Sequence, residues 1–273
     1  MKNATFLLLI LISLCVVQSC EDAVKPGIPV GGDFVYPLSI GNTWTYNLSV
    51  TYSDIHPDSI KWRLNNYSMG FQDVVTGDTT INSINVYEIR EWGPDISDSY
   101  TYLGNDTSGM YEYAYRIYKS SDLAKSNPQK QFRFRDIFFN DGIDFIRQLE
   151  KSVLNSSPMD DSLYVLDDPN LVYLYPMQVS RQWIYTYDPY RIKKVIIGKV
   201  TVETDAGRYD CFKVQREYTS SIGFNYTEYV GSVGLVKIVI EIENLAITTV
   251  ENPDGIGRAD LKYVVSLTDV NIQ

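Results

Sequence analysis

Histidine and cysteine are scarce in this chain of 273 residues. The sequence has one histidine, His56, which stands before a proline in an expected turn, and three cysteines. Zinc sites need several histidine or cysteine ligands, and catalytic triads need a histidine base, so the sequence argues against both. Phosphate-binding loops and nucleophile-elbow motifs are also lacking. We therefore expect no catalytic residue, no metal and no cofactor.

The few cysteines also argue against a disulfide framework. Cys15 lies within an apolar N-terminal run and Cys20 directly follows that run, which leaves Cys211 for the body of the chain. If Cys20 carries a lipid, Cys211 has no partner within the mature chain. It lies in a predicted strand without an activating basic neighbour, so we expect a buried, unreactive thiol.

Basic residues are outnumbered by acidic ones. The chain has 24 Lys and Arg against 34 Asp and Glu, a formal net charge of -10. This balance argues against nucleic acid as a partner and against electrostatic attraction to an anionic membrane. Hydrophobic residues make up 44% of the chain and tyrosines number 22. That composition can build the core of one large or two small domains.

The first twenty residues look like a bacterial lipoprotein signal. Lys2 is the only charge before an apolar run from Phe6 to Val17, and Gln18-Ser19-Cys20 follows. The run is too short for a membrane span of about 20 residues. In lipoproteins of this kind the cysteine becomes the lipidated first residue. The resemblance implies a signal peptide over 1–19 and lipidation of Cys20, with an ordinary secretory signal as the alternative.

Residues 20–33 are predicted to be a flexible tether, because two prolines and three glycines occur there with little periodicity. A lipid anchor would make the membrane a partner and place the protein in the cell envelope. We expect an outer-membrane lipoprotein that faces the periplasm or the cell surface. The pair Glu21-Asp22 resembles the acidic export signal of some surface lipoproteins, and an ordinary solvated tether is the alternative.

One motif occurs twice in the chain. It combines Tyr-Pro, two aliphatic residues and Trp-x-Tyr, first as YPLSIGNTWTY at 36–46 and again as YPMQVSRQWIY at 175–185. The proline suits the start of an edge strand, and the two aromatic residues share one face of the next strand. Because Ser180 replaces Gly41, we expect the two turns to differ in type. The motif supplies four aromatic residues that we predict to be either core anchors or ligand-facing: Trp44, Tyr46, Trp183 and Tyr185.

Strand and turn signals follow each copy in the same order. The sequence therefore predicts a mainly β protein with two related antiparallel β units, each a curved sheet, over 34–155 and 173–273. Apolar residues at helical spacing predict one helix near 141–154, between the units. The polar segment 156–172 carries four Asp and two Pro and is predicted to be an exposed linker. We therefore favour two lobes over one merged sheet.

Three stretches resemble uncharacterised bacterial cell-envelope lipoproteins. They are the first motif copy, TDAGRYDCFKV at 204–214 and YVGSVGLVK at 229–237, which match the YPLxxGNxWxY and AGxYDCFKV/GLVK patterns of that group. The resemblance covers 34–47 and 173–240. It implies a cell-envelope β fold, of the curved-sheet type seen in lipoprotein carriers, and it supplies no catalytic residue.

These observations favour a non-enzymatic envelope lipoprotein that binds an apolar ligand or scaffolds an envelope assembly. The alternative is a surface lipoprotein that binds glycan through exposed aromatic residues. A third hypothesis is a hydrolase that uses carboxylates alone, such as Asp160-Asp161 or Asp167-Asp168. Burial separates the first two, because aromatics in a dry groove favour apolar cargo and an exposed flat row favours sugar. A carboxylate pair in a cleft would favour the third.

Overall fold

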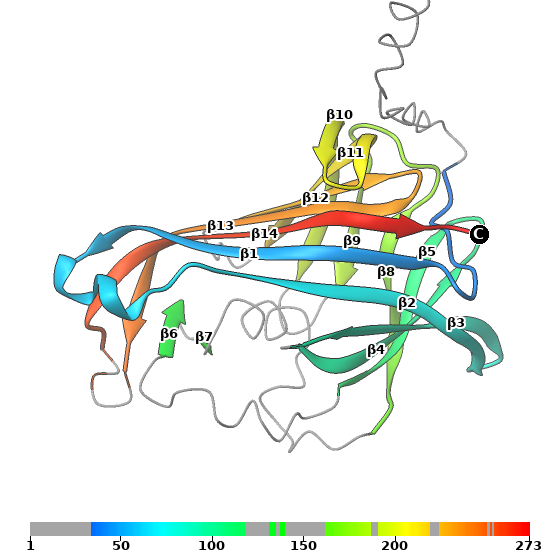
Figure 1. The fold of residues 1–273 in the computed structure, drawn as a ribbon. Helices are drawn as coiled ribbons and strands as arrows, with labels where there is room; N and C mark the ends of the chain where they lie inside the picture. The colour runs from blue at the N-terminus through cyan, green and yellow to red at the C-terminus, as the bar shows by residue number, and fades with distance from the viewer. Residues whose placement is uncertain are drawn as a thin grey trace, which may run out of the picture.

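The computed structural model of the chain describes residues 34–94, 96–117, 131–134, 137–139, 162–186, 191–218, 224–249, 252 and 254–273. The predicted signal peptide, Cys20, the tether and the helix near 141–154 lie outside these residues. The described part is almost entirely β-strand (Figure 1).

The strands are named in chain order. They are β1 (Thr43–His56), β2 (Tyr67–Ile81), β3 (Ile84–Gly93), β4 (Ile96–Asn105), β5 (Gly109–Ile117), β6 (Gln131–Phe134), β7 (Ile137–Phe139), β8 (Tyr164–Leu174), β9 (Gln182–Thr186), β10 (Ile192–Thr204), β11 (Gly207–Tyr218), β12 (Phe224–Gly231), β13 (Gly234–Thr248) and β14 (Gly257–Asn271), with one short 3-10 helix, η1 (Asp58–Arg63), after β1.

These strands form one antiparallel sheet. Its order is β8-β5-β4-β3-β2-β1-β14-β13-β12-β11-β10-β9, and the small β6–β7 pair attaches to β13. The first and last long strands, β1 and β14, pair from Thr43 opposite Asn271 to His56 opposite Arg258. The expected separation into two lobes is therefore wrong. Separate lobes would leave the edges of two long apolar strands unpaired, and their pairing removes both edges.

Part of the expected linker is also a strand. β8 covers 164–174 and pairs with β5, but its register shifts between Asn170 opposite Glu112 and Val165 opposite Ala114. The extra residues on β8 form a bulge that contains Asp167, Asp168 and Pro169, all exposed. Bulges tolerate proline and polar residues that a regular ladder disfavours. This bulge accounts for two of the four Asp and one of the two Pro that gave the linker prediction, and the other three lie outside the described residues.

The strand order repeats within the sheet. β1-β2-β3-β4-β5-β8 is one six-stranded run of neighbours, and β9-β10-β11-β12-β13-β14 is another. We refer to these runs as the first and second halves of the sheet. The halves share one continuous sheet, and each begins with one copy of the repeated motif. The turn at 82–83 joins the second and third strands of the first half, and the turn at 205–206 joins those of the second half.

The two motif turns have the same geometry, contrary to expectation. Gly41 and Ser180 both adopt positive φ, 91° and 71°. The amide of Gly41 donates to the carbonyl of Val75 at 2.9 Å, and the amide of Ser180 donates to that of Ile196 at 2.7 Å. A serine can occupy the left-handed region at a modest cost when the surrounding hydrogen bonds fix it there. The Gly-to-Ser difference therefore does not change the turn.

The sheet curls until its edge strands, β8 and β9, lie near one another (Figure 1). Within the described residues no backbone ladder joins these two edges. Side chains cross the seam instead: the Trp183 indole donates to the Leu171 carbonyl at 2.9 Å, and the Lys194 amine donates to the Val172 carbonyl at 3.3 Å. The core fills the concave side of the curl, where Leu48, Phe212 and many other side chains are fully buried.

Candidate functional site

The four aromatic residues of the repeated motif lie in the core. Trp44 and Tyr46 are each 1% exposed, and Trp183 and Tyr185 are 7% and 8% exposed. The Trp44 indole donates to the Val233 carbonyl at 2.5 Å, and the Tyr46 hydroxyl donates to the Leu235 carbonyl at 3.0 Å. Buried aromatic residues with satisfied polar atoms stabilise a fold. The structure therefore places these side chains away from any exposed binding platform.

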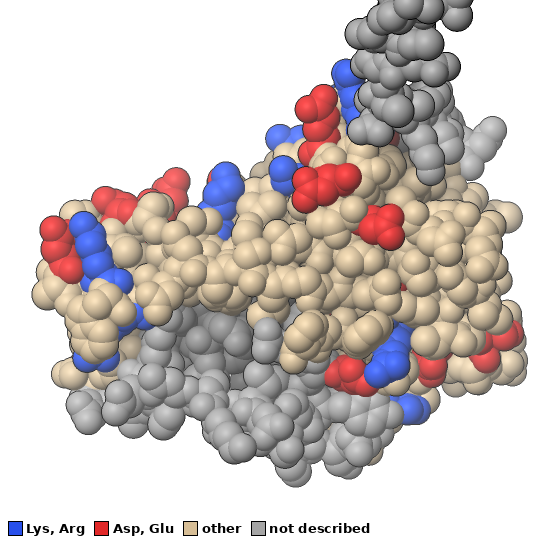
Figure 2. All heavy atoms as spheres, viewed as in Figure 1, with Lys and Arg blue, Asp and Glu red and all other residues tan. Residues whose placement is uncertain are grey.

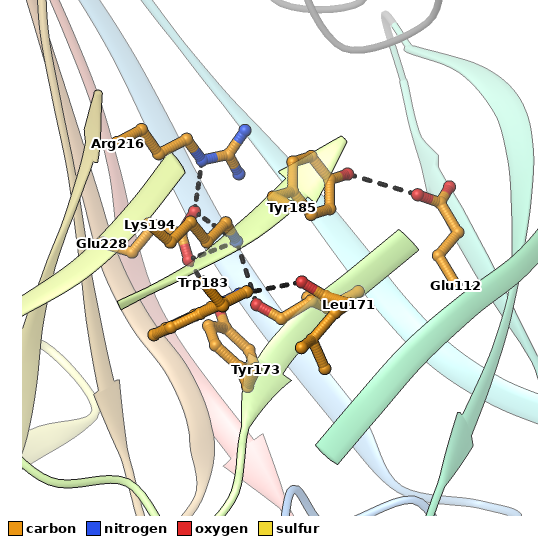
Figure 3. A network of polar contacts seen from close by, with 9 residues as sticks. Glu112, Leu171, Tyr173, Trp183, Tyr185, Lys194, Arg216 and Glu228 are labelled. Atoms are coloured by element: carbon orange, nitrogen blue, oxygen red, sulfur yellow. Dashed lines mark hydrogen bonds and ion pairs between the residues drawn. The ribbon is translucent and has the colours of Figure 1, made fainter. Parts of the chain in front are cut away.

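A buried network of charged side chains is the most distinctive chemistry of the described residues (Figure 3). At its centre, the Glu228 carboxylate on β12 accepts hydrogen bonds from Arg216 Nε at 2.5 Å, the Tyr173 hydroxyl at 2.8 Å and Lys194 Nζ at 3.2 Å. The side chains of Lys194, Glu228 and Arg216 are 0%, 2% and 7% exposed. Buried charges are tolerated when they are paired and hydrogen-bonded in this way.

Strand register brings the charged residues together. Lys194 on β10 lies directly opposite Arg216 on β11, and Glu228 on β12 lies opposite Val214, two residues from Arg216. Lys194 also alternates with Ile192 and Ile196, which are both fully buried. Alternation puts all three residues of β10 on the core face. That pattern was the signal in the sequence for a buried lysine, and our sequence analysis missed it.

The electrostatics of Glu228 are set by its cations. Burial alone would raise the pKa of Glu228, but attraction to Arg216 and Lys194 and their hydrogen bonds outweigh burial and lower it to about 2. The carboxylate is therefore ionised at neutral pH. For Tyr173, burial and the negative charge of Glu228 both raise the pKa of the hydroxyl, which stays protonated and donates.

Aromatic rings complete the surroundings of the cations. The Lys194 amine lies 4.5 Å from the Tyr185 ring centre, and the Arg216 guanidinium lies 3.8 Å from the Tyr226 ring centre. Cation–aromatic attraction is stronger in such desolvated positions than at the surface. The Tyr185 hydroxyl extends the network by donating to the buried carboxylate of Glu112 at 3.2 Å. The network thus links β5 and β8 to β9 and β10 across the seam.

A second pair of charged residues faces inward in the first half of the sheet. Asp73 on β2 lies directly opposite Glu91 on β3, and the Ser99 hydroxyl donates to Glu91 at 3.3 Å. Burial, and then repulsion from Glu91, raise the pKa of Asp73 well above its ordinary value. Our sequence analysis missed this pair as well. The carboxylates that it did consider are Asp167 and Asp168, on the exposed bulge of β8, and Asp160-Asp161, outside the described residues.

Two tryptophans are exposed, and neither belongs to the motif. Trp62 on η1 is 70% exposed, and the Arg63 guanidinium lies 4.5 Å from its ring centre. Trp92 on β3 is 43% exposed, with the Arg90 guanidinium 5.7 Å from its ring centre. Arg90 also pairs with Asp98 at 2.6 Å. Each exposed ring therefore stands beside a group that can form hydrogen bonds.

Cys211 lies in the core and His56 lies at the surface. Cys211 is fully buried, and burial together with Asp210 raises the pKa of its thiol to about 12, so the thiol is protonated. His56 pairs with Asp54 at the surface, at 2.9 Å. Among the described residues no group of three or more His, Cys, Asp or Glu could hold a metal ion. No helix of the described part is long and apolar enough to cross a membrane.

On the face drawn in Figure 2, acidic and basic side chains are interspersed, and neither sign forms a continuous patch.

No family model matches the chain, and no curated protein matches it. Among solved structures, it is similar to a candidate lipoprotein from Parabacteroides distasonis ATCC 8503, with 13% identity, a TM-score of 0.34 and coverage of 87% of this chain and 98% of the other. It is also similar to a candidate exported protein with a YmcC-like fold from Bacteroides fragilis NCTC 9343, with 14% identity, a TM-score of 0.28 and coverage of 87% and 99%. A structural similarity at this level gives no information about what this chain does.

Proposed function

We propose that this protein is a non-enzymatic cell-envelope lipoprotein, anchored in the outer membrane by a lipid on Cys20, whose sheet serves as a scaffold for an envelope assembly. The signal-like N-terminus supports the anchor. The motif aromatics and the Glu228 network fill the concave face of the sheet. Because these side chains occupy the face where apolar cargo would bind, the structure favours a scaffold rather than a carrier. The charged groups of that network bond to one another and hold the curled sheet together.

The observation that carries the scaffold proposal is the position of Trp62. The first described residue, Phe34, precedes the start of β1, and η1 follows the far end of β1 (Figure 1). The 14 residues of β1 separate these two ends by about 45 Å. A tryptophan that is 70% exposed at the end of a long, rigid strand suits docking of a partner, because aromatic residues dominate protein interfaces.

The anchor is tested by Cys20→Ser. A lipid-anchored protein should stay with the membrane fraction after a high-salt wash, and the variant should be soluble in the periplasm or the medium. Retention of the variant in the washed membranes would show that Cys20 is not the tether.

The docking tip is tested by photo-crosslinking in intact cells, with a photoreactive residue at position 62 and, as a control, at position 84. Ile84 is 42% exposed and is the first residue of β3, directly after the turn at 82–83 and away from η1. We expect a discrete crosslinked protein from position 62 and none from position 84, and loss of the same complex on Trp62→Ala. Equal crosslinking from both positions would contradict a specific docking tip.

The second candidate function is glycan binding at Trp92. An exposed ring can stack on a sugar, and the neighbouring Arg90–Asp98 pair can form hydrogen bonds to hydroxyl groups. The test is retardation of the protein in gels that contain envelope polysaccharides. Trp92→Ala should abolish the retardation, and Trp62→Ala should leave it unchanged. If both variants behave like the wild type, this site binds no glycan.

A further inference from the structure

Two aliphatic side chains protrude at matching positions of the repeated motif. Ile40 is 50% exposed and Val179 is 48% exposed, whereas the aliphatic residues two positions before them, Leu38 and Met177, are buried. Ile40 and Val179 each precede the positive-φ residue of a turn. Solvent-facing turn positions are usually polar. Both copies of the motif nevertheless carry an aliphatic residue here, although the two copies differ at Leu38/Met177, Ser39/Gln178 and Gly41/Ser180.

Both turns lie at the same end of the sheet. Six antiparallel steps lead from β1 through β14 to β9, so β1 and β9 run in the same direction. The turns that precede them therefore lie at the same end of the sheet. A direct contact agrees with this arrangement, because the Tyr175 hydroxyl accepts a hydrogen bond from the Tyr36 amide at 2.9 Å.

Two further apolar side chains lie at this end. The C-terminal residue Gln273 donates its amide to the Asn42 side chain at 2.9 Å, which brings Ile272, 36% exposed, beside the first turn. Val35, 54% exposed, directly precedes the first motif copy. We call Val35, Ile40, Val179 and Ile272 the anchor-end rim. The basic residue of the second turn, Arg181, points its guanidinium at the carbonyls of Tyr175 and Pro176.

The anchor-end rim is where the tether joins the fold. Residues 20–33 connect Cys20 to Phe34 and can span at most about 50 Å when fully extended. The lipid therefore keeps this end of the sheet close to the membrane. With a net charge of -10, the protein gains nothing electrostatically by lying on an anionic membrane. An uncharged aliphatic rim is the part of this end that suits the apolar boundary of the lipid headgroups.

We propose that the anchor-end rim rests on the lipid surface, so that the protein stands on its end with the Trp62 tip directed away from the membrane. This inference rests on the proposed lipidation of Cys20. It adds an orientation that an anchor on a flexible tether would not impose by itself.

The experiment uses the full lipidated protein in vesicles of phosphatidylethanolamine and phosphatidylglycerol that contain an energy-transfer acceptor lipid. A fluorescent donor is attached to Ile40→Cys, to Val179→Cys or, as the control at the far end, to Trp62→Cys. The native Cys211 should not label, because its thiol is buried and protonated. We expect energy transfer from positions 40 and 179 to be several-fold more efficient than from position 62.

A double variant, Ile40→Asp with Val179→Asp, tests the role of the rim itself. With the donor placed at an exposed position of the same end, Ile272→Cys, this variant should lower the transfer efficiency while its melting temperature stays near that of the wild type. Efficient transfer from position 62, or no change in the double variant, would overturn the inference. Flotation with the vesicles separates the two proposals: protein that fails to float refutes the anchor and with it the orientation, whereas protein that floats with equal transfer from both ends refutes the orientation alone.

Discussion

Lys194 and Asp73 occupy matching positions in the two halves of the sheet. Lys194 lies opposite Trp183, the tryptophan of the second motif copy, and Asp73 lies opposite Trp44, the tryptophan of the first. Both positions follow from the same local pairing, because the strand after each motif strand, β2 after β1 and β10 after β9, returns alongside it. One position of the repeat therefore carries opposite charges in the two halves.

The next strand of each half, β11 in the second and β3 in the first, shows the same contrast of charge. Arg216 lies opposite Lys194, and Glu91 lies opposite Asp73, so the second half faces the core with two cations and the first half with two carboxylates. The cations hold the Glu228 carboxylate between them. For Asp73, the dominant influences are burial and the like charge of Glu91. The two sites should therefore respond in opposite ways to loss of charge.

Glu228→Gln should destabilise the protein strongly. The substitution leaves two buried cations without their carboxylate, and breaking a buried ion pair in this way costs about 3–5 kcal/mol. Thermal or urea unfolding measures the loss. The matched control is Glu241→Gln, because Glu241 pairs with Lys262 at 2.8 Å but both side chains are about half exposed. An exposed pair contributes at most about 1 kcal/mol. Equal losses in the two variants would contradict the assigned role of Glu228.

The acid dependence of stability should follow the same carboxylate. The pKa of Glu228 is lowered from 4.5 to about 2, so its contribution is present above about pH 4.5 and is lost as the pH falls toward 2. At 1.36 kcal/mol for each pKa unit, the full effect is roughly 3 kcal/mol. The measured quantity is the difference in unfolding free energy between wild type and Glu228→Gln, which should shrink over this range. A constant difference would mean that Glu228 does not titrate with a lowered pKa.

Asp73→Asn should stabilise the protein at neutral pH. The pKa of Asp73 is raised in the folded state, so the wild type loses stability as the pH rises above about 4, through the folded pKa. An amide removes one like charge of this partly buried pair and should raise the unfolding free energy by on the order of 1–3 kcal/mol near pH 7. The control is Asp167→Asn on the exposed bulge of β8. If Asp73→Asn destabilises at all pH values, the Asp73 carboxyl group makes a stabilising hydrogen bond or ion pair in the folded protein that outweighs its repulsion from Glu91.

The sequence predicted the strands better than the way in which they assemble. Each Trp-x-Tyr copy lies in the first strand of a six-stranded run of neighbours. The assembly into one sheet could not be read from the motif, because the pairing of β1 with β14 depends on residues more than two hundred positions apart. The bulge of β8 concealed a strand, since Asp167, Asp168 and Pro169 have the composition of a loop.

The buried charges were missed for a different reason. A lysine is usually taken as solvent-exposed, and Lys194 directly follows Lys193, which faces the other side of β10. Only strict alternation along the strand places Lys194 on the same face as Ile192 and Ile196. Glu228 and Arg216 lie on separate strands, so only the register shows that they meet. The seam between β8 and β9 was equally hidden, because side chains rather than a ladder connect the edges.

The seam gives a test of how the sheet closes, through Trp183 and Trp44. Truncation of either large core side chain to alanine should cost about 3–5 kcal/mol. Trp183→Phe keeps most of the ring and removes the indole donor to the Leu171 carbonyl on β8, which should cost about 1 kcal/mol. Trp44→Phe removes a comparable donor to the Val233 carbonyl in the turn between β12 and β13, and serves as the matched control.

Amide hydrogen exchange distinguishes the two phenylalanine variants. Because no ladder joins β8 to β9 in the described part, local opening at this seam should be easier in Trp183→Phe. We expect exchange in β8 and β9 to become about tenfold faster for each 1.4 kcal/mol lost, with the β1–β14 amides unchanged. Trp44→Phe should not produce this local change. Faster exchange across the whole sheet in Trp183→Phe, with no excess in β8 and β9, would mean that the indole stabilises the core globally and does not close the seam.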